Sequence, residues 1–517
     1  MFPKLKNISL SLTDMLGEEY LAAVTRAASA LGIGREAELR TLATQKVDFF
    51  PESFATRLDG LLDRLGQEVC TPWPNSCPGA GTKAFTDALH ATSAPLAALG
   101  FLRVGEDGRL YFIGKSEHYQ ASLGHDFPGY ELLQLASKIG ISNITHNNTR
   151  GHITRTLERE LVRVANGLAP DDNDALDAVI ASTQPHVLNR AINLETGSLA
   201  CEAAVKMMLA RFYKLQPHFD APDKSGFTPV FLVMGDYRQG REANYHGTTI
   251  FTQMLRGMWH EMANGMENAG LVKAVGVPIN DFAGFQAAVE KYDQGSTRVA
   301  GFIHELILMN YGAIKLHEDY LASCYELCHS RGIPCFVDEI QSCMWSPEIF
   351  LFKEYGLKPD FVSVGKGFPG GMYPASKILT TAEMDNLNLF GALVTNGQEE
   401  IASLANLITL HFAEANADYI REIGQLWRSA LTESVEQFPK AISAVEGHGL
   451  LSSLVFQETD KAVAFSKIMS QKFCIDVSVQ TYKANCPPAV LMKPPLITSQ
   501  KAIDIIKRAI GQTLKEL

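Results

Sequence analysis

The sequence predicts an α/β fold with a large, mainly parallel sheet, a small α+β domain and a helical N-terminal extension. Between about residues 200 and 380, short apolar runs alternate with helical stretches, a pattern typical of a parallel sheet covered by helices. After residue 420, helical and strand patterns are mixed, which indicates the second, smaller domain. The first hundred residues carry apolar residues mainly at helical spacing.

Length and turn signals suggest how these units divide the chain. The 517 residues are enough for two or three packed units. A loop rich in proline and glycine at residues 71–81 marks the clearest internal break. The predicted division is a helical N-terminal extension at 1–100, the N-terminal part of the small domain with a linking segment at 101–190, a large domain at 191–420 and the C-terminal small domain at 421–517.

Composition excludes several classes of protein. The net charge of −11 argues against a general nucleic-acid binder, which needs a basic surface. No run of eighteen apolar residues is present and the start does not resemble a secretory signal, so we expect neither a membrane span nor export. Nine scattered cysteines indicate reduced thiols in the cytoplasm. Cys324 and Cys328 are interpreted as the buried side of a helix rather than as metal ligands, because zinc needs a second close pair.

The strands of the predicted sheet are short and apolar on both sides. They are "PVFLVMG" at 229–235, "VAGFIHELIL" at 299–308, "IPCFVDEI" at 333–340 and "DFVSVG" at 360–365. Ligands of such sheets bind at the carboxyl ends of the strands. Polar residues that directly follow these runs are therefore candidates for a functional site.

A small-residue turn opens the helix that begins near residue 197. Thr196, Gly197 and Ser198 precede a helical pattern, and a helix N-terminus offers free N–H groups and a positive dipole end to a phosphate. The alternative is an ordinary capped helix with no ligand.

Two further segments supply an aromatic ring and an acid. Tyr245 precedes a His-Gly turn and could stack on a planar cofactor, although packing alone is the alternative. Asp338 and Gln341 follow an apolar strand, where an acid could keep a pyridinium nitrogen protonated. The alternative for these two residues is a solvated acidic loop.

Lys366 follows the last of the predicted strands and lies between glycines. Burial at a strand end would lower the pKa of such a lysine and make its amine a nucleophile for a carbonyl group. The alternative is a lysine in a surface turn.

Taken together, these segments resemble the class III aminotransferases, fold-type I enzymes that depend on pyridoxal 5′-phosphate (PLP). The stretch from "CFVDEIQS" to "DFVSVGKGFPGG" is similar to the family's Asp-Glu-x-Gln strand end and lysine loop, and "TGSLACEAAVKMMLAR" is similar to its phosphate loop. "YHGTT" resembles its aromatic-His-Gly turn, and "VTNGQEEIASLANL" its Thr-x-Gly segment. The resemblance covers about residues 100–517 and implies a seven-stranded sheet and a small domain built from both chain ends.

The resemblance also implies a role for each matching residue. Lys366 would hold PLP as a Schiff base and shuttle the proton, and Asp338 would pair with the pyridine nitrogen. The family builds its sites at a dimer interface, so a homodimer with shared active sites is expected. The remaining assignments are Gln341 near the phenolic oxygen, Tyr245 against the ring, Gly197 and Ser198 at the phosphate, Thr395 at the neighbouring subunit's phosphate and Glu305 near the substrate.

Departures from the family pattern lie on the substrate side. Trp345 stands in a loop where the family has small residues, and Leu491 replaces an arginine that often binds a substrate carboxylate. These changes predict a more apolar pocket. The alternative is that another cation binds the carboxylate, with Arg150, Arg190 and Lys493 as the candidates.

The predicted function is amino transfer between an amine or amino acid and a keto acid or aldehyde. A racemase, epimerase or aminomutase of the same family is one alternative, and a catalytically silent binding or scaffold relative is another. No metal is expected.

Overall fold

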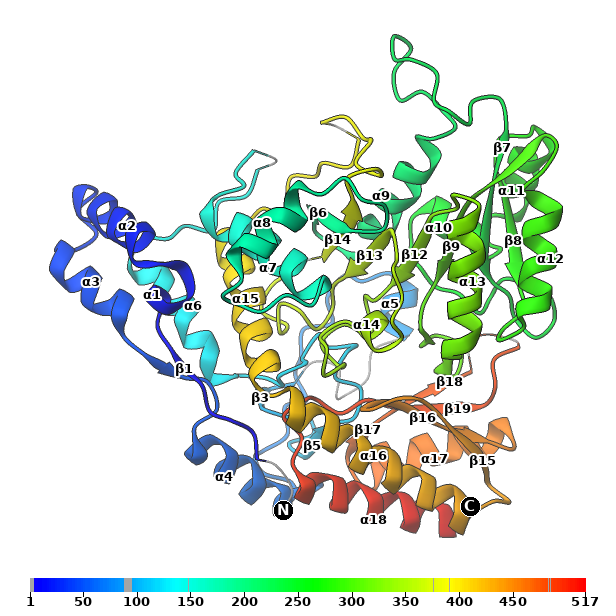
Figure 1. Cartoon of the computed structure of the whole chain (residues 1–517). Helices are drawn as coiled ribbons and strands as arrows, with labels where there is room; N and C mark the ends of the chain where they lie inside the picture. Colours follow the sequence, from blue (N-terminus) through cyan, green and yellow to red (C-terminus); the bar gives the residue numbers. More distant parts are fainter. Residues whose placement is uncertain are drawn as a thin grey trace.

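The structure is a computed structural model that describes residues 4–87, 95–146, 148–374, 376–389, 391–481, 483 and 485–517. A seven-stranded sheet forms its centre (Figure 1). Six strands run parallel and β14 alone runs antiparallel, so the predicted large, mainly parallel sheet is confirmed. In spatial order the strands are β6 (Leu188–Leu194), β14 (Ser376–Thr381), β13 (Phe361–Val364), β12 (Cys335–Asp338), β9 (Thr297–His304), β7 (Thr228–Met234) and β8 (Lys273–Val277).

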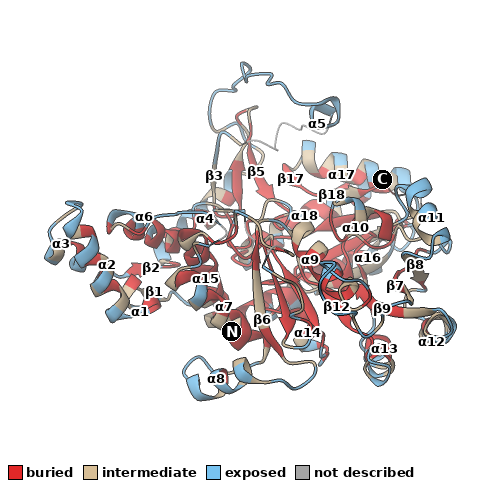
Figure 2. Ribbon diagram, turned by 90° about the horizontal axis from the view of Figure 1, so that it is seen from above, coloured by how far each residue is buried: buried red, intermediate tan, exposed pale blue. Residues whose placement is uncertain are grey.

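Apolar side chains on both faces explain why the strand sequences are continuous apolar runs. In β7, Phe231 and Val233 belong to one buried cluster and Val230 and Leu232 to another. Side chains of a strand alternate between the two faces of a sheet, so both faces of β7 are packed. Figure 2 shows the sheet as buried and the outer sides of the surrounding helices as exposed.

Helices cover the sheet and connect its strands. Helix α9 packs on β13 and β14, whereas α12 packs on β8 and β9. The helices of this part are α7 (His152–Ala165), α8 (Asn173–Ala181), α9 (Gly197–Leu209), α10 (Ile250–Leu255), α11 (His260–Asn268), α12 (Phe282–Tyr292), α13 (Glu318–Ser330), α14 (Leu351–Glu354) and α15 (Glu400–Ala415). The hairpin strands β10 (Ile307–Leu308) and β11 (Ile314–Lys315) follow β9.

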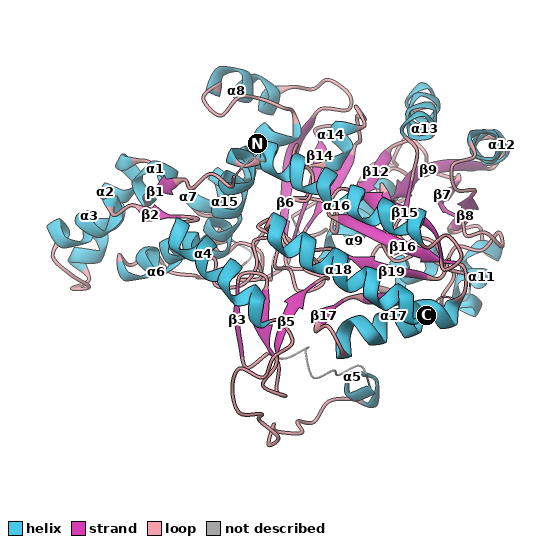
Figure 3. Cartoon of the chain, turned by 90° about the horizontal axis from the view of Figure 1, so that it is seen from below, coloured by secondary structure: helices cyan, strands magenta, loops and turns pink. Residues whose placement is uncertain are grey.

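The small domain is built from both ends of the chain (Figure 3). One of its sheets has the order β15-β16-β19-β18, and the other joins β17 to the early strands β5, β4 and β3. Its elements are β3 (Ala97–Leu99), β4 (Leu102–Val104), β5 (Leu110–Ile113), α16 (Ala417–Gln437), β15 (Ile442–His448), β16 (Leu451–Phe456), α17 (Thr459–Gln471), β17 (Ile475–Asp476), β18 (Ser478–Gln480), β19 (Ala489–Met492) and α18 (Gln500–Glu516).

The N-terminal extension is mainly helical and projects to one side of the molecule (Figure 1). Helix α4 ends at Leu61, and Gly66 shortly after it adopts a positive φ of 82°. The elements of this segment are β1 (Ser9–Leu10), α1 (Leu12–Leu16), α2 (Glu18–Ala30), α3 (Glu36–Thr44), β2 (Val47–Asp48), α4 (Glu52–Leu61), the 3₁₀ turn Leu62–Arg64 and α5 (Lys83–Asp87). The 3₁₀ turn Pro128–Tyr130 and α6 (Glu131–Lys138) pass beside it. Among the helices that the structure describes, none combines the length and the apolar character that a membrane crossing requires.

Candidate active site

The carboxyl ends of several parallel strands surround one cavity of about 400 Å³. Asp338 is the last residue of β12, Glu305 directly follows β9, and Lys366 lies two residues beyond β13. These positions meet because the carboxyl ends of parallel strands share one edge of the sheet. The cavity is lined by Gln120, Glu195, Thr196, Gly197, Ser198, Cys201, Tyr245, His246, Gly247, Glu305, Asp338, Ile340, Gln341, Lys366 and Pro374.

Asp338 is a buried carboxylate held by several donors. His246 Nδ1 lies 2.9 Å from Oδ2, while Ser363 Oγ donates to Oδ1 at 2.7 Å and the Ile340 N–H donates to Oδ1 at 3.0 Å. Burial alone would raise the pKa of Asp338, but the hydrogen bond and charge of His246, together with the other donors, bring it below the usual value. Asp338 therefore keeps a negative charge at the base of the cavity.

Lys366 is fixed on a tight turn. Its φ is 32°, a region that residues other than glycine rarely adopt, and the glycines on either side allow close packing. A Cβ atom on Gly365 would lie 2.7 Å from Ser376 Oγ, and one on Gly367 would lie 2.5 Å from the Trp345 ring. The "GKG" sequence is thus explained by crowding around the lysine loop.

The N-terminus of α9 faces the same cavity and contacts the turn at Gly247. Thr196, Gly197 and Ser198 line the cavity, and the first N–H groups of a helix have no partner within it. Gly247 has a φ of 118°, and a Cβ atom there would lie 2.6 Å from the Ser198 Cα atom. This helix start can accept an anionic group such as a phosphate.

Tyr245, which precedes the His-Gly turn, lines the cavity together with the residues at the start of α9. The guanidinium of Arg256 lies 5.3 Å from the centre of the Tyr245 ring. The Arg256 guanidinium makes no hydrogen bond or ion pair with any residue that the structure describes, although the Arg256 backbone N–H donates to the Gln253 carbonyl at 3.2 Å. The sequence did not single out this cation, because only the folded chain brings it to the aromatic ring.

Glu305 and Gln341 form a buried pair within the cavity. Gln341 Nε2 donates to Glu305 Oε1 at 3.1 Å, while Glu305 Oε2 has no hydrogen-bond partner among the described residues. Burial and the nearby Asp338 carboxylate raise the pKa of Glu305 well above its usual value. The shift is thus opposite in direction to that of Asp338, whose pKa lies below its usual value.

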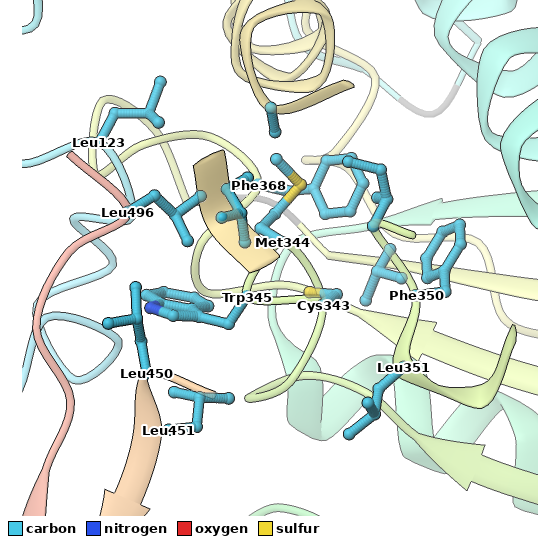
Figure 4. Close-up of a cluster of buried hydrophobic side chains, with 14 of the residues drawn as sticks. Leu123, Cys343, Met344, Trp345, Phe350, Leu351, Phe368, Leu450, Leu451 and Leu496 are labelled. Carbon is cyan, nitrogen blue, oxygen red and sulfur yellow. The ribbon is translucent and has the colours of Figure 1, made fainter. Parts of the chain in front are cut away.

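Trp345 is buried beside the site and does not line the cavity (Figure 4). The figure shows its indole ring close to Leu450 and Leu496, and its Nε1–H donates to the Pro494 carbonyl at 3.3 Å. Its ring supports the Lys366 loop at Gly367 rather than facing a ligand. Leu491 is fully buried in β19 and is likewise absent from the cavity lining.

The three cations that the sequence offered for a substrate carboxylate already have carboxylate partners. Arg150 Nε donates to Glu158 at 2.6 Å, and Arg190 lies 3.5 Å from Asp385. Lys493 forms an ion pair with Glu117, and both side chains are fully buried. The Glu117 partner was missed, because 376 residues separate it from Lys493 and no local pattern links them.

Thr395 lies apart from the residues that line the cavity of its own subunit. It is exposed, and its carbonyl accepts a hydrogen bond from Thr145 Oγ1 at 2.9 Å. Within its own chain, Thr395 therefore lies outside the cavity at the start of α9.

Known proteins resemble this chain over most of its length. The sequence model of the family "Aminotransferase class-III" matches residues 107–514. A putrescine aminotransferase of Pectobacterium atrosepticum is 23% identical over 76% of this chain and 80% of its own length. An ornithine aminotransferase of Emericella nidulans is 28% identical over 62% of this chain and 69% of its own length.

Solved structures share the fold. The ornithine aminotransferase of Toxoplasma gondii superposes with a TM-score of 0.62 and 17% identity, covering 84% of this chain and 94% of that protein. A transaminase from the marine bacterium Virgibacillus gives a TM-score of 0.64 with 16% identity, covering 84% of this chain and 95% of that protein. The fold-type I architecture expected from the motifs is confirmed.

Proposed function

This chain belongs to the class III aminotransferases, which are PLP-dependent, and we propose that Lys366 carries the cofactor through its ε-amine. The observation that supports this assignment is the cavity that brings Lys366, Asp338 and the N-terminus of α9 together. These groups fit PLP, because an amine, an acid and a phosphate site are the partners that its aldehyde, pyridine nitrogen and phosphate require. The Gly247 turn leaves room at the helix start that a side chain would fill.

Each residue around the cavity has a defined task in this proposal. When bound, PLP supplies a ring that spreads the charge left as the substrate carbon loses a proton. Asp338, ionised and buried, would accept a hydrogen bond from the ring nitrogen and keep that nitrogen protonated. Tyr245 would pack against the ring, Gln341 would lie near the phenolic oxygen, and the N–H groups of Gly197 and Ser198 would bind the phosphate.

Lys366 is the group that moves the proton. When a substrate amino group takes the place of the ε-amine at the carbonyl carbon of PLP, the freed ε-amine would be able to take the proton from the substrate carbon and pass it on. Burial raises the pKa of Glu305 well above its usual value, so this carboxyl group binds a proton more readily than an ordinary glutamate does.

Borohydride reduction in the presence of PLP tests the lysine assignment. The reduced label is expected on Lys366, and Lys366→Ala is expected to lose turnover while it still folds. Lys377→Met is the matched control, because Lys377 is also buried but donates to the Gly397 carbonyl at 3.2 Å outside the cavity. A label on another lysine, or full activity of Lys366→Ala, would contradict the assignment.

We propose that amino donors include molecules both with and without a carboxylate, and that a substrate carboxylate binds Arg256. Arg150, Arg190 and Lys493 are engaged with acids, whereas Arg256 has no described ionic partner and lies against Tyr245. A guanidinium offers two parallel hydrogen bonds to a carboxylate.

A comparison of α-amino acids with the matching amines tests this substrate assignment. Arg256→Met is expected to raise the KM for the α-amino acids roughly 10- to 150-fold, the range of a lost charged hydrogen bond, and to leave the amines within about twofold. Arg241→Met is the control, because Arg241 already donates to the Ala274 carbonyl at 2.7 Å. Equal losses with both classes of donor in Arg256→Met would refute the assignment.

We propose a homodimer in which Thr395 reaches the cofactor phosphate of the other subunit, since Thr395 does not line the cavity of its own chain. We propose the cytoplasm as the location, because all nine cysteines are free thiols and none forms a disulfide in the described chain.

A further inference from the structure

The Asp338 carboxylate already accepts a full set of hydrogen bonds from this chain. Ser363 and Ile340 donate to Oδ1. Oδ2 accepts from His246 at 2.9 Å and from the Cys201 thiol at 3.3 Å. A carboxylate offers about four lone-pair positions, so these four donors fill it.

The proposed function requires one more donor at the same carboxylate, namely the N–H of the cofactor ring. One of the four present donors must therefore move. The Ile340 N–H is fixed by the backbone, and Ser363 on β13 does not line the cavity. Only His246 and Cys201 both line the cavity and contact Oδ2.

The thiol is the weaker of these two donors. An S–H group donates a weak hydrogen bond, whereas an imidazole N–H facing a carboxylate makes a strong one. Cys201 also has a second acceptor within reach, because its sulfur lies 4.0 Å from Ser363 Oγ. Burial and the Asp338 charge raise the pKa of Cys201 well above its usual value, so the thiol keeps the proton that it donates.

We propose that Cys201 is a displaceable hydrogen-bond donor that satisfies Asp338 Oδ2 until the cofactor ring nitrogen takes its place. This inference rests on the proposed function and adds a positioning residue to that site. The thiol of Cys201 stabilises the charge and the orientation of the buried Asp338 carboxylate. PLP binding must break this weak hydrogen bond. The affinity for PLP therefore depends on how strongly residue 201 donates.

Two substitutions at this position are expected to change cofactor affinity in opposite directions. Cys201→Ala removes the competing donor, so the dissociation constant for PLP is expected to fall about threefold to tenfold, the size of one weak hydrogen bond. Cys201→Ser supplies a stronger donor of similar size, so the constant is expected to rise by a similar factor. The measurement is equilibrium PLP binding to the full-length protein freed of cofactor, followed by absorbance or fluorescence.

Thermal unfolding with and without PLP gives a second readout that does not depend on turnover. Cys201→Ala is expected to lower the Tm of the cofactor-free protein more than that of the PLP-bound protein, because only the former loses a bond to Asp338. Cys343→Ala is the matched control, since this buried thiol donates to the Gly365 carbonyl at 3.6 Å and does not contact Asp338. It is expected to lower both Tm values equally.

The outcomes separate this inference from the proposed function. Weaker PLP binding in both Cys201 variants, or equal Tm losses in both forms of Cys201→Ala, would show a packing role and overturn the inference alone. Failure of the unaltered protein to bind PLP would overturn the proposed function as well.

Discussion

Lys493 and Glu117 form an ion pair whose two side chains have no exposed surface. Burial lowers the pKa of Lys493 to about 8. At Glu117 burial raises the pKa, but the neighbouring charges, Lys493 first among them, and the Lys493 hydrogen bond together bring it below the usual value. His118 Nε2 also lies 3.1 Å from Glu117, but the Lys493 charge lowers the pKa of His118 to about 3. Lys493 is therefore the cation that compensates Glu117 at neutral pH, and it is not free to bind a substrate.

Removing one member of this pair is expected to destabilise the protein strongly. Lys493→Met leaves a buried carboxylate without its cation, which costs about 3–5 kcal/mol in the free energy of unfolding. The double variant Glu117→Gln with Lys493→Met leaves no buried charge and is expected to recover most of that loss. Denaturant unfolding of the single and double variants measures both values.

An exposed pair of the same kind provides the control. Arg421 lies 2.9 Å from Asp418, and their side chains are 44% and 73% exposed. Arg421→Met is expected to change the free energy of unfolding by less than about 1 kcal/mol. If Lys493→Met cost no more than Arg421→Met, the buried pair would not have the structural role described above.

At the scale of elements, the site depends on a contact between a turn and a helix start. The turn at Gly247 presses against Ser198 at the beginning of α9, and its positive φ suits glycine alone. The distance between this turn and the helix N-terminus sets the space for a phosphate.

Gly247→Ala is expected to weaken PLP binding about tenfold or more, because the new methyl group would lie 2.6 Å from the Ser198 Cα atom. Gly257→Ala is the control, since Gly257 also has a positive φ of 92° but no atom within 4 Å of the added carbon. Both variants are expected to lose about 1 kcal/mol of stability from backbone strain. PLP titration distinguishes them, and equal affinities would show that the turn does not shape the phosphate site.

The elements of the large domain could be predicted because their signals are local. The runs "PVFLVMG" and "DFVSVG" are both strands, and a parallel sheet requires such runs to be apolar on both faces. The sequence also placed Lys366 and Asp338 at strand ends that prove to share a cavity.

Other features could not be predicted because they depend on distant contacts. The ion pair of Glu117 with Lys493 joins residues 376 positions apart, and the Trp345 hydrogen bond to the Pro494 carbonyl spans 149 positions. The Cys201 contact with Asp338 was also missed, since a cysteine on an amphipathic helix is indistinguishable from an ordinary buried thiol.

At the scale of the whole molecule, the proposed homodimer rests on the position of Thr395. It lies on the surface, apart from the cavity of its own chain, while the proposed phosphate site lies at the start of α9. A dimer that exchanged this residue would complete each site with a residue from the other chain.

Mixing two inactive variants tests this exchange. Lys366→Ala subunits lack the amine, and Thr395→Ala subunits are expected to bind PLP weakly. A mixed dimer would contain one complete site, built from Lys366 of one chain and Thr395 of the other. At limiting PLP, mixed dimers are expected to hold close to one tightly bound, borohydride-reducible cofactor per dimer. If the mixed dimers bound no more cofactor than the Thr395→Ala homodimer, Thr395 would act within its own subunit or not at all.

The pairing of β5 with β17 determines when this part of the protein can fold during synthesis. Phe112 pairs with Ile475, so a strand made early on the ribosome must wait for a partner encoded 363 residues later. At about 5–20 residues per second, that wait lasts roughly 20–70 s. Throughout it, the apolar side chains of β5 lack their final cover, and the Lys493–Glu117 pair cannot form. The nascent chain therefore exposes an apolar strand long before its cofactor site is complete.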